Sequence, residues 1–185
     1  NHYQDPEIVD RCVAWLDYQV RSQGSNGGWN NETYKTWIGG PDRMEANGGI
    51  NAGARAVGEV YTELADAIEA GGYLDEYIDD DLNPNTPMVT RKKAYINMYV
   101  KASDYMFNVI ERKPAVNQEL FNVVSGVAYQ MALKRLSPES CMSDEALKQR
   151  MYEATGVVAS PRGSILISPK GLSMETVGHL DGAYD

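Results

Sequence analysis

Residues 116–136 read VNQELFNVVSGVAYQMALKRL, and this proline-free stretch decides the fold class. Pro114 precedes it and Pro138 follows it, so the chain is interrupted on both sides. Its apolar side chains recur at the spacing of one helix face; they are Leu120, Val123, Val124, Val127, Met131 and Leu136. We therefore expect a helix over residues 116–136 that packs through a single apolar stripe.

Four other segments show the same helical spacing, at residues 6–23, 50–70, 90–112 and 144–155. Side chains that commonly cap helices precede three of them, namely Asp5 (followed by Pro6), Thr86 (followed by Pro87, with Thr90 as a second possible cap) and Ser143. Gly24 and the pair Gly71-Gly72 are expected to end the first two helices in a left-handed conformation.

The same spacing predicts which side chains face inward. In the first helix these are Ile8, Cys12, Trp15, Leu16 and Val20; in the second, Ala54, Val57, Tyr61, Leu64 and Ile68; in the third, Tyr95, Met98, Tyr99, Ala102, Tyr105, Met106 and Val109. Helices of this kind pair antiparallel across their connections. We predict an all-α fold of antiparallel helical hairpins that forms a bundle, an arc or a partial (α/α) toroid, with a short extended segment at residues 164–168.

The composition is that of a globular chain, because 43% of the 185 residues are hydrophobic and 23% are charged. The net charge of −9 argues against nucleic acid as a partner, since nucleic acids select basic surfaces. No apolar run is long enough to span a membrane, and no signal peptide is visible. The chain begins at Asn1 and stops at Asp185 within what reads as a motif, so we expect residues 1–185 to be one all-α domain and a fragment of a larger catalytic domain.

Three further features have alternative or ordinary interpretations. Cys12 and Cys141 allow either two buried free thiols or one disulfide. The acidic run at residues 79–81 lacks the ligand ladder and closing Glu of a Ca²⁺ loop, so we interpret it as a solvated turn and expect no metal and no cofactor. The basic run Arg-Lys-Lys at residues 91–93 is expected to be a solvated face or a source of local positive potential.

The segment 23–49 is long, irregular and rich in glycine, and loops of this length inside a domain are often functional. It contains Trp29, Trp37 and Arg43 together with several Asn. Aromatic rings cover the C–H face of a sugar, while Arg and amide groups bind its carboxylates and hydroxyls. Two interpretations stay open: a sugar-binding platform, or aromatic side chains that anchor the loop to the core.

The second candidate region is the C-terminal segment 168–185, SPKGLSMETVGHLDGAYD. Its glycines and proline disfavour a regular helix or strand. It gathers side-chain types that transfer protons, namely Lys170, Glu175, His179, Asp181 and Tyr184. The segment is therefore either a site carried on a helical scaffold or an ordinary solvated loop.

Asn117 and Gln118 form a third candidate. They lie in the first turn of the helix expected at 116–136, where amides and free backbone N–H groups can meet an anionic ligand. In the alternative interpretation, Asn117 is the N-cap and its side-chain oxygen is occupied.

Together these features resemble the helical-toroid polysaccharide lyases, the group that includes alginate, chondroitin and heparinase-type lyases. The matching parts are the Gly-rich loop around Trp29 and Trp37, the helix opening Asn117-Gln118, and the closing residues 178–184, Gly-His-Leu-Asp-Gly-Ala-Tyr. The resemblance covers most of this chain but only part of such an enzyme. Several of those families have an aromatic residue after the Asn, where this chain has Gln118.

The resemblance implies β-elimination on a uronic-acid-containing polysaccharide. Asn117 would bind the uronate carboxylate and stabilise the developing enolate, with help from Gln118 or Arg43. His179 or Tyr184 would take the C5 proton, and Tyr184 would protonate the leaving C4 oxygen. The implied substrate-binding residues are Trp29, Trp37, Arg43, Gln118 and Glu175.

The resemblance also implies a secreted or periplasmic location, and partners that are an acidic polysaccharide and the remainder of a larger chain or other subunits. Two other functions stay open. A glycoside hydrolase would use Glu175 and Asp181 as its paired carboxylates. A non-catalytic module would bind sugar or another subunit, and would not depend on His179 or Tyr184.

Overall fold

The structure is a computed structural model that describes residues 5–29, 52–81, 83–109, 116–155, 157–159 and 165–167. Within these residues the α-helices are α1 (Pro6–Ser22), α4 (Ala52–Ala70), α5 (Arg91–Val109), α6 (Val116–Leu136) and α7 (Asp144–Thr155). Two 3₁₀ turns, η2 (Tyr73–Asp75) and η4 (Pro138–Ser140), lie between them. The predicted all-α class is confirmed.

Two short antiparallel ribbons accompany the helices. Strand β1 (Tyr77–Ile78) pairs with β2 (Val89–Thr90), with Tyr77 opposite Thr90. Strand β3 (Val157–Ala159) pairs with β4 (Ile165–Ile167), with Val158 opposite Leu166. The sequence predicted only β4, the second strand of the second ribbon. Strands β1, β2 and β3 have two or three residues each, which is too short for the alternation of apolar and polar side chains that predicts a strand.

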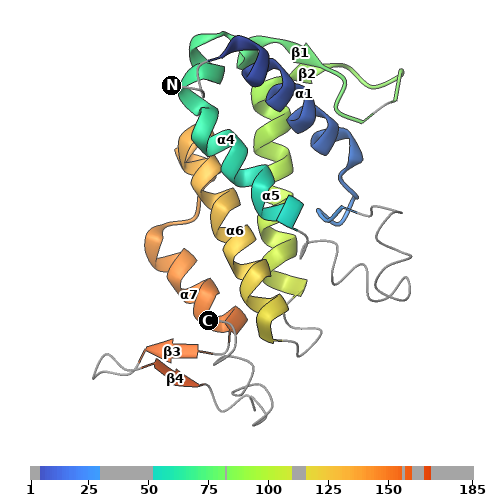
Figure 1. Ribbon diagram of the computed structural model, residues 1–185. Helices are drawn as coiled ribbons and strands as arrows, with labels where there is room; N and C mark the ends of the chain where they lie inside the picture. The colour runs from blue at the N-terminus through green and yellow to red at the C-terminus, as the bar shows by residue number, and fades with distance from the viewer. Residues whose placement is uncertain are drawn as a thin grey trace.

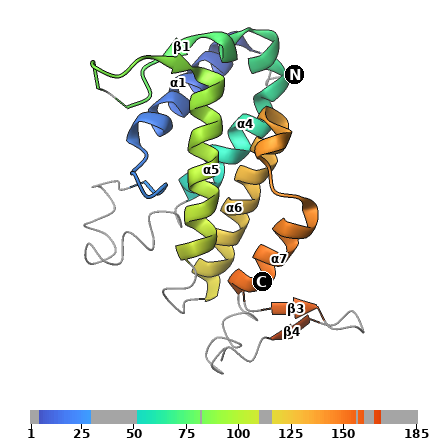
Figure 2. The same cartoon turned by 180° about the vertical axis from the view of Figure 1, so that it is seen from behind.

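Helix α6 is the centre of the arrangement. It packs against α4, α5 and α7, while α1 lies across the end of the bundle where α5 begins (Figures 1 and 2). Consecutive α-helices run in opposite directions, so α4 and α6 lie side by side with the same direction (Figure 1). The antiparallel arrangement expected from the sequence is therefore present.

Local side-chain chemistry fixes the helix ends. Asp5 Oδ1 accepts a hydrogen bond of 3.0 Å from the backbone N–H of Glu7, and Pro6 is the first residue of α1. Ser143 Oγ accepts from Ala146 N–H at 3.1 Å at the start of α7. These are the expected caps. Because α5 begins at Arg91, its cap is Thr90, whose Oγ1 lies 3.4 Å from Lys93 N, and not Thr86.

Glycine ends one helix as expected and not the other. Gly72 follows α4 with a φ of 72°, in the left-handed region. Helix α1 instead ends at an extended Gln23, and the left-handed residue is Gly27, with a φ of 90°. A Cβ on Gly27 would lie 2.2 Å from the carbonyl oxygen of Lys101. The turn after α1 therefore needs glycine where it touches α5, three residues later than predicted.

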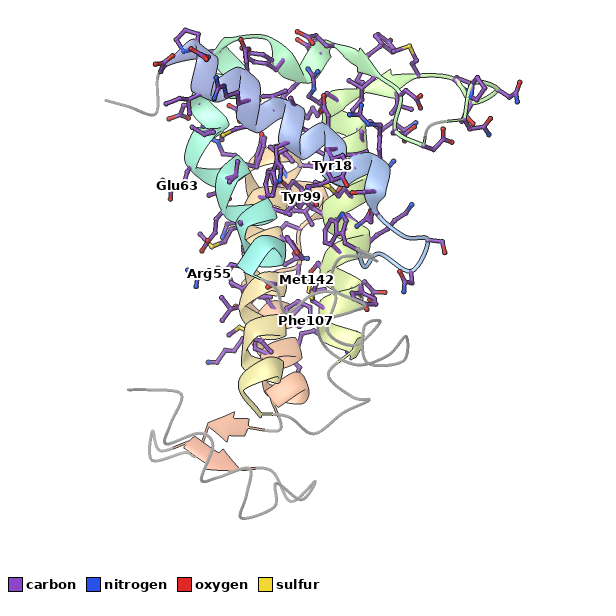
Figure 3. All side chains as sticks on the ribbon, turned by 45° about the vertical axis from the view of Figure 1, so that its right-hand side comes forward. Tyr18, Arg55, Glu63, Tyr99, Phe107 and Met142 are labelled. Carbon is purple, nitrogen blue, oxygen red and sulfur yellow. The ribbon has the colours of Figure 1, made fainter. Side chains whose placement is uncertain are left out.

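The core confirms two of the predicted faces at the residues whose burial the structure describes, which do not include Ala54 and Val109. In α4 the buried side chains include Val57, Tyr61, Leu64 and Ile68, and in α5 they include Tyr95, Met98, Tyr99, Ala102, Tyr105 and Met106. Figure 3 shows Tyr99 in the interior, whereas Arg55 and Glu63 point away from α4. The even spacing of large side chains on these helices made their inward faces predictable.

The other two faces were predicted less well. In α1 the predicted Leu16 and Val20 are buried, but the buried face is rotated toward Val9, Val13 and Asp17, and Ile8 is 38% exposed. In α6 the predicted Val123 and Leu136 are buried, but Val124 and Met131 are exposed. The other buried side chains include Tyr129, Ala132 and Leu133. Helix α6 is covered by three neighbours. Its buried surface is therefore wider than one stripe and centred on other residues.

Candidate functional site

Many of the predicted site residues lie outside the part of the chain that the structure describes. They are Trp37 and Arg43 in the first candidate region, and Lys170, Glu175, His179, Asp181 and Tyr184 in the C-terminal one. The residues that can be placed are Trp29, Asn117 and Gln118.

Asn117 and Gln118 occupy the first turn of α6, as predicted. The helix begins at Val116, so Asn117 is already the second helical residue and is not the N-cap. The first backbone N–H groups of an α-helix have no partner within the helix, and the helix dipole adds partial positive charge there. The start of α6 therefore has the intrinsic chemistry for binding an anion such as a carboxylate.

The start of α6 lies at a defined end of the molecule. Because α5 and α7 both run antiparallel to α6, they stop at the end where α6 begins (Figures 1 and 2). Strand β3 packs beside α7 at this same end. The fold thus brings the chain, as it leaves α7 for the C-terminal region, back to the end of the bundle that carries Asn117.

Trp29 is part of the core. Its side chain is only 9% exposed, its Nε1 donates to the carbonyl of Gln19 at 2.9 Å, and its ring centroid lies 6.0 Å from that of Tyr129. A ring in this position has little free face to offer a sugar. This favours the second interpretation for Trp29, in which it anchors the loop.

The turn that carries Trp29 is fastened to α5. Gln23 Nε2 donates to the carbonyls of Gly27 and Met98, both at 2.9 Å, and Gln23 and Trp29 form an isolated antiparallel bridge. A Cβ on Gly28 would lie 2.7 Å from the ring of Tyr105. The start of the first candidate region therefore has a fixed position on the side of α5.

A buried charged cluster is centred on Arg91, and the sequence did not predict it. Arg91 is 7% exposed and is not part of a solvated basic face, whereas Lys92 and Lys93 are exposed. Its Nε donates to Asp17 Oδ1 at 2.9 Å, and its Nη1 donates to Glu76 Oε2 at 2.9 Å and to the carbonyl of Tyr73. Tyr95 completes the cluster by donating its hydroxyl to Asp17 Oδ1 at 2.9 Å. We call Asp17, Glu76, Arg91 and Tyr95 the Arg91 cluster.

The Arg91 cluster joins α1, the η2–β1 segment and α5. Burial alone would lower the pKa of Arg91, but its hydrogen bonds to Asp17 and Glu76 outweigh burial and raise the pKa above its ordinary value. The pKa of Tyr95 is also raised, first by burial and then by the charge of Asp17. Each member is hydrogen-bonded to at least one other member, so the cluster holds these three parts of the fold together; Asp17, Arg91 and Tyr95 are buried, whereas the Glu76 side chain is 57% exposed.

The two cysteines carry free thiols, and both are half-buried. Cys141 Sγ lies 3.4 Å from the carbonyl oxygen of Gln130 and 3.3 Å from that of Met142, either of which can accept its S–H proton, and burial raises the pKa of its thiol. The raised pKa makes this thiol a weak nucleophile at neutral pH.

Within the described residues, no three His, Cys, Asp or Glu side chains gather as metal ligands would. The helices in the same part of the chain lack the combination of length and apolar character needed to span a membrane. No family model, curated protein or solved structure compared with the chain matches it.

Proposed function

We propose that this chain forms part of the catalytic domain of a polysaccharide lyase, which cleaves a uronic-acid-containing polysaccharide by β-elimination. The observation that carries the proposal is the position of Asn117 and Gln118 in the first turn of α6. Their helix starts at the end of the bundle to which the chain returns after α7, on its way to His179 and Tyr184.

The chemistry makes this position useful. The C5 proton of a uronate is weakly acidic, because the adjacent carboxylate resists further negative charge. Amide and backbone N–H groups at the start of α6 would bind that carboxylate and stabilise the enolate as it forms. A neutral His179, whose ordinary pKa lies near neutrality, or Tyr184 would take the proton. Tyr184 would then protonate the C4 oxygen as it leaves.

The direct test follows the absorbance of the unsaturated product during incubation with uronate-containing polysaccharides. The natural protein should generate this absorbance with at least one such polymer. Cleavage that releases reducing ends without it would support the hydrolase that uses Glu175 and Asp181. Binding without cleavage would support the non-catalytic module.

Variants then test the individual roles. Asn117→Ala should lower kcat/KM by about 10²–10³-fold, the usual cost of removing one donor to an oxyanion. Met131→Ala, at an exposed position of the same helix, is the matched control and should retain activity. His179→Ala and Tyr184→Phe should abolish turnover while sugar binding persists. Full activity in all three site variants would refute the proposal.

A further inference from the structure

The core contains a row of aromatic rings that the proposed function does not use. Trp29, Tyr129, Tyr99 and Tyr95 follow one another with ring centroids 6.0, 5.9 and 6.5 Å apart. The row begins at the turn after α1 and crosses from α6 to α5. Trp29 lies nearest the surface, whereas Tyr99, Tyr129 and Tyr95 are fully buried. We call these four residues the aromatic row; Tyr61 flanks it, 6.1 Å from both Tyr95 and Tyr99.

The hydroxyl groups along the row differ in what they can do with a proton. Tyr95 donates to the carboxylate of Asp17 at 2.9 Å, and a carboxylate can accept the proton outright. Tyr99 donates to the backbone carbonyl of Val57 at 2.8 Å, and an amide carbonyl is too weak a base to do so. The Tyr61 hydroxyl lies 3.5 Å from Glu69, at the limit of a hydrogen bond.

This difference matters because a phenol that loses an electron becomes a very strong acid. A buried tyrosine is therefore easiest to oxidise where a base already accepts its hydrogen bond. Burial raises the pKa of Tyr95, Tyr99 and Tyr129, so that their phenols keep their protons at neutral pH. Oxidation in the row must then be coupled to proton transfer, and at Tyr95 the Asp17 carboxylate already lies in position to accept the proton.

We propose that the aromatic row conducts one-electron oxidation, so that an oxidised Trp29 is repaired at the expense of Tyr95. A small one-electron oxidant, such as the carbonate radical anion, takes an electron from the Trp29 indole and becomes carbonate. The Trp29 radical cation then receives an electron from Tyr95 through Tyr129 and Tyr99, while the Tyr95 phenolic proton moves to Asp17 Oδ1. The products are neutral Trp29, a neutral Tyr95 radical and a protonated Asp17, so charge and electrons balance.

The surroundings of Asp17 suit this step. Arg91 holds the carboxylate with Nε and Nη2 at 2.9–3.2 Å, which fixes its oxygen against the Tyr95 hydroxyl. When Asp17 gains the proton, the guanidinium still has Glu76 and the Tyr73 carbonyl as partners. The positive charge of Arg91 is therefore still compensated after Tyr95 has been oxidised. This property is independent of the proposed lyase activity.

The test is pulse radiolysis of the intact protein with carbonate radicals, followed by absorbance at several protein concentrations. The tryptophan radical band should decay into a tyrosyl radical band at a rate independent of protein concentration and slower in D₂O. Trp29→Phe and Tyr99→Phe should each lose this phase, because phenylalanine is much harder to oxidise. Tyr18→Phe is the matched control: Tyr18 is 56% exposed on α1 and lies outside the row, so the phase should persist.

Electron paramagnetic resonance identifies the radical that remains. In frozen wild-type samples the tyrosyl spectrum should be present, and Tyr95→Phe should remove it. An unchanged spectrum in Tyr95→Phe, or an unchanged concentration-independent phase in Tyr99→Phe, would overturn the proposal. If circular dichroism shows that Tyr95→Phe does not fold, the wild type decides: a purely bimolecular decay, or equal rates in H₂O and D₂O, would overturn it.

Discussion

The two ends of the helix bundle are held together by different physics. At the end where α5 begins, α1, the η2–β1 segment and α5 meet around the Arg91 cluster, whose Asp17–Arg91 pair is buried. At the end where α6 begins, a small apolar cluster has Phe107 and Val123 at its centre, packed by Val127, Met142, Leu147 and Met151. Charged hydrogen bonds fix directions and fail when one partner is lost, whereas apolar contacts depend mainly on volume. The end distant from Asn117 is thus held by hydrogen bonds of fixed direction, and the end that carries Asn117 is held by apolar packing.

The sharpest way to break the charged end is to remove one partner. Arg91→Ala should lower the free energy of unfolding by about 3–5 kcal/mol, because it leaves Asp17 buried without a counter-charge. Urea unfolding followed by circular dichroism measures this loss. Lys92→Ala, at the exposed neighbouring position, is the control and should change stability little. Equal effects of the two substitutions would show that the cluster does not hold this end.

Replacing both partners tests whether the stability of this end requires charged side chains, or only that no buried charge is left without a partner. The double variant Asp17→Leu with Arg91→Met should recover most of the stability lost in Arg91→Ala, since a matched apolar pair is often as stable as a buried ion pair. The same urea titration on the two single variants and the double variant gives the coupling energy. Strictly additive losses would mean that Asp17 and Arg91 act independently.

At the apolar end, a substitution should change the free energy of unfolding less than at the charged end. The sign of the change should depend on the size of the side chain that the new group touches. A Cβ on Gly126 would lie 2.9 Å from the ring of Phe107, so Gly126→Ala adds overpacking of about 1–3 kcal/mol. Alanine also favours the helix by about 1 kcal/mol relative to glycine. We expect a small net loss of stability in thermal unfolding. In a Phe107→Leu background the clash is relieved, and Gly126→Ala should instead stabilise; the same loss in both backgrounds would contradict this explanation.

The smallest effect is expected where charges face water. Lys134 of α6 and Asp144 of α7 lie 3.2 Å apart, with side chains 65% and 80% exposed. Lys134→Gln should change the free energy of unfolding by less than about 1 kcal/mol, because solvent screens exposed pairs. A loss as large as that in Arg91→Ala would show that exposure does not separate the two kinds of ion pair.

The sequence predicted the elements better than their contacts. Helix α6 begins and ends where its proline-bounded apolar pattern placed it, and the Asp5, Thr90 and Ser143 caps follow from side-chain chemistry within three residues. These signals are local, so a single sequence carries them. The rotation of α1 was missed because Asp17 is buried by a partner 74 residues away, and no spacing rule reports such a pair.

The candidate site was predictable to a similar degree. Helical periodicity sufficed to place Asn117 and Gln118 in a first turn. It did not suffice for Trp29, because a tryptophan in a glycine-rich turn has no periodicity to indicate whether its ring faces solvent or the core. One signal for the Arg91 cluster was available: Asp17 follows Val9 and Val13 at four-residue spacing, and Arg91 precedes Tyr95 by four residues. A charge that continues an apolar face on each of two helices indicates a buried pair.

The central position of α6 sets how the molecule should open. Because α4, α5 and α7 all pack on it, its middle can become exposed to solvent only when the bundle separates as a whole. Helix α1 covers one end and is released by a smaller fluctuation. Backbone amide protons around Tyr129 should therefore exchange with deuterium only through global unfolding, whereas those of α1 should exchange faster, through local opening.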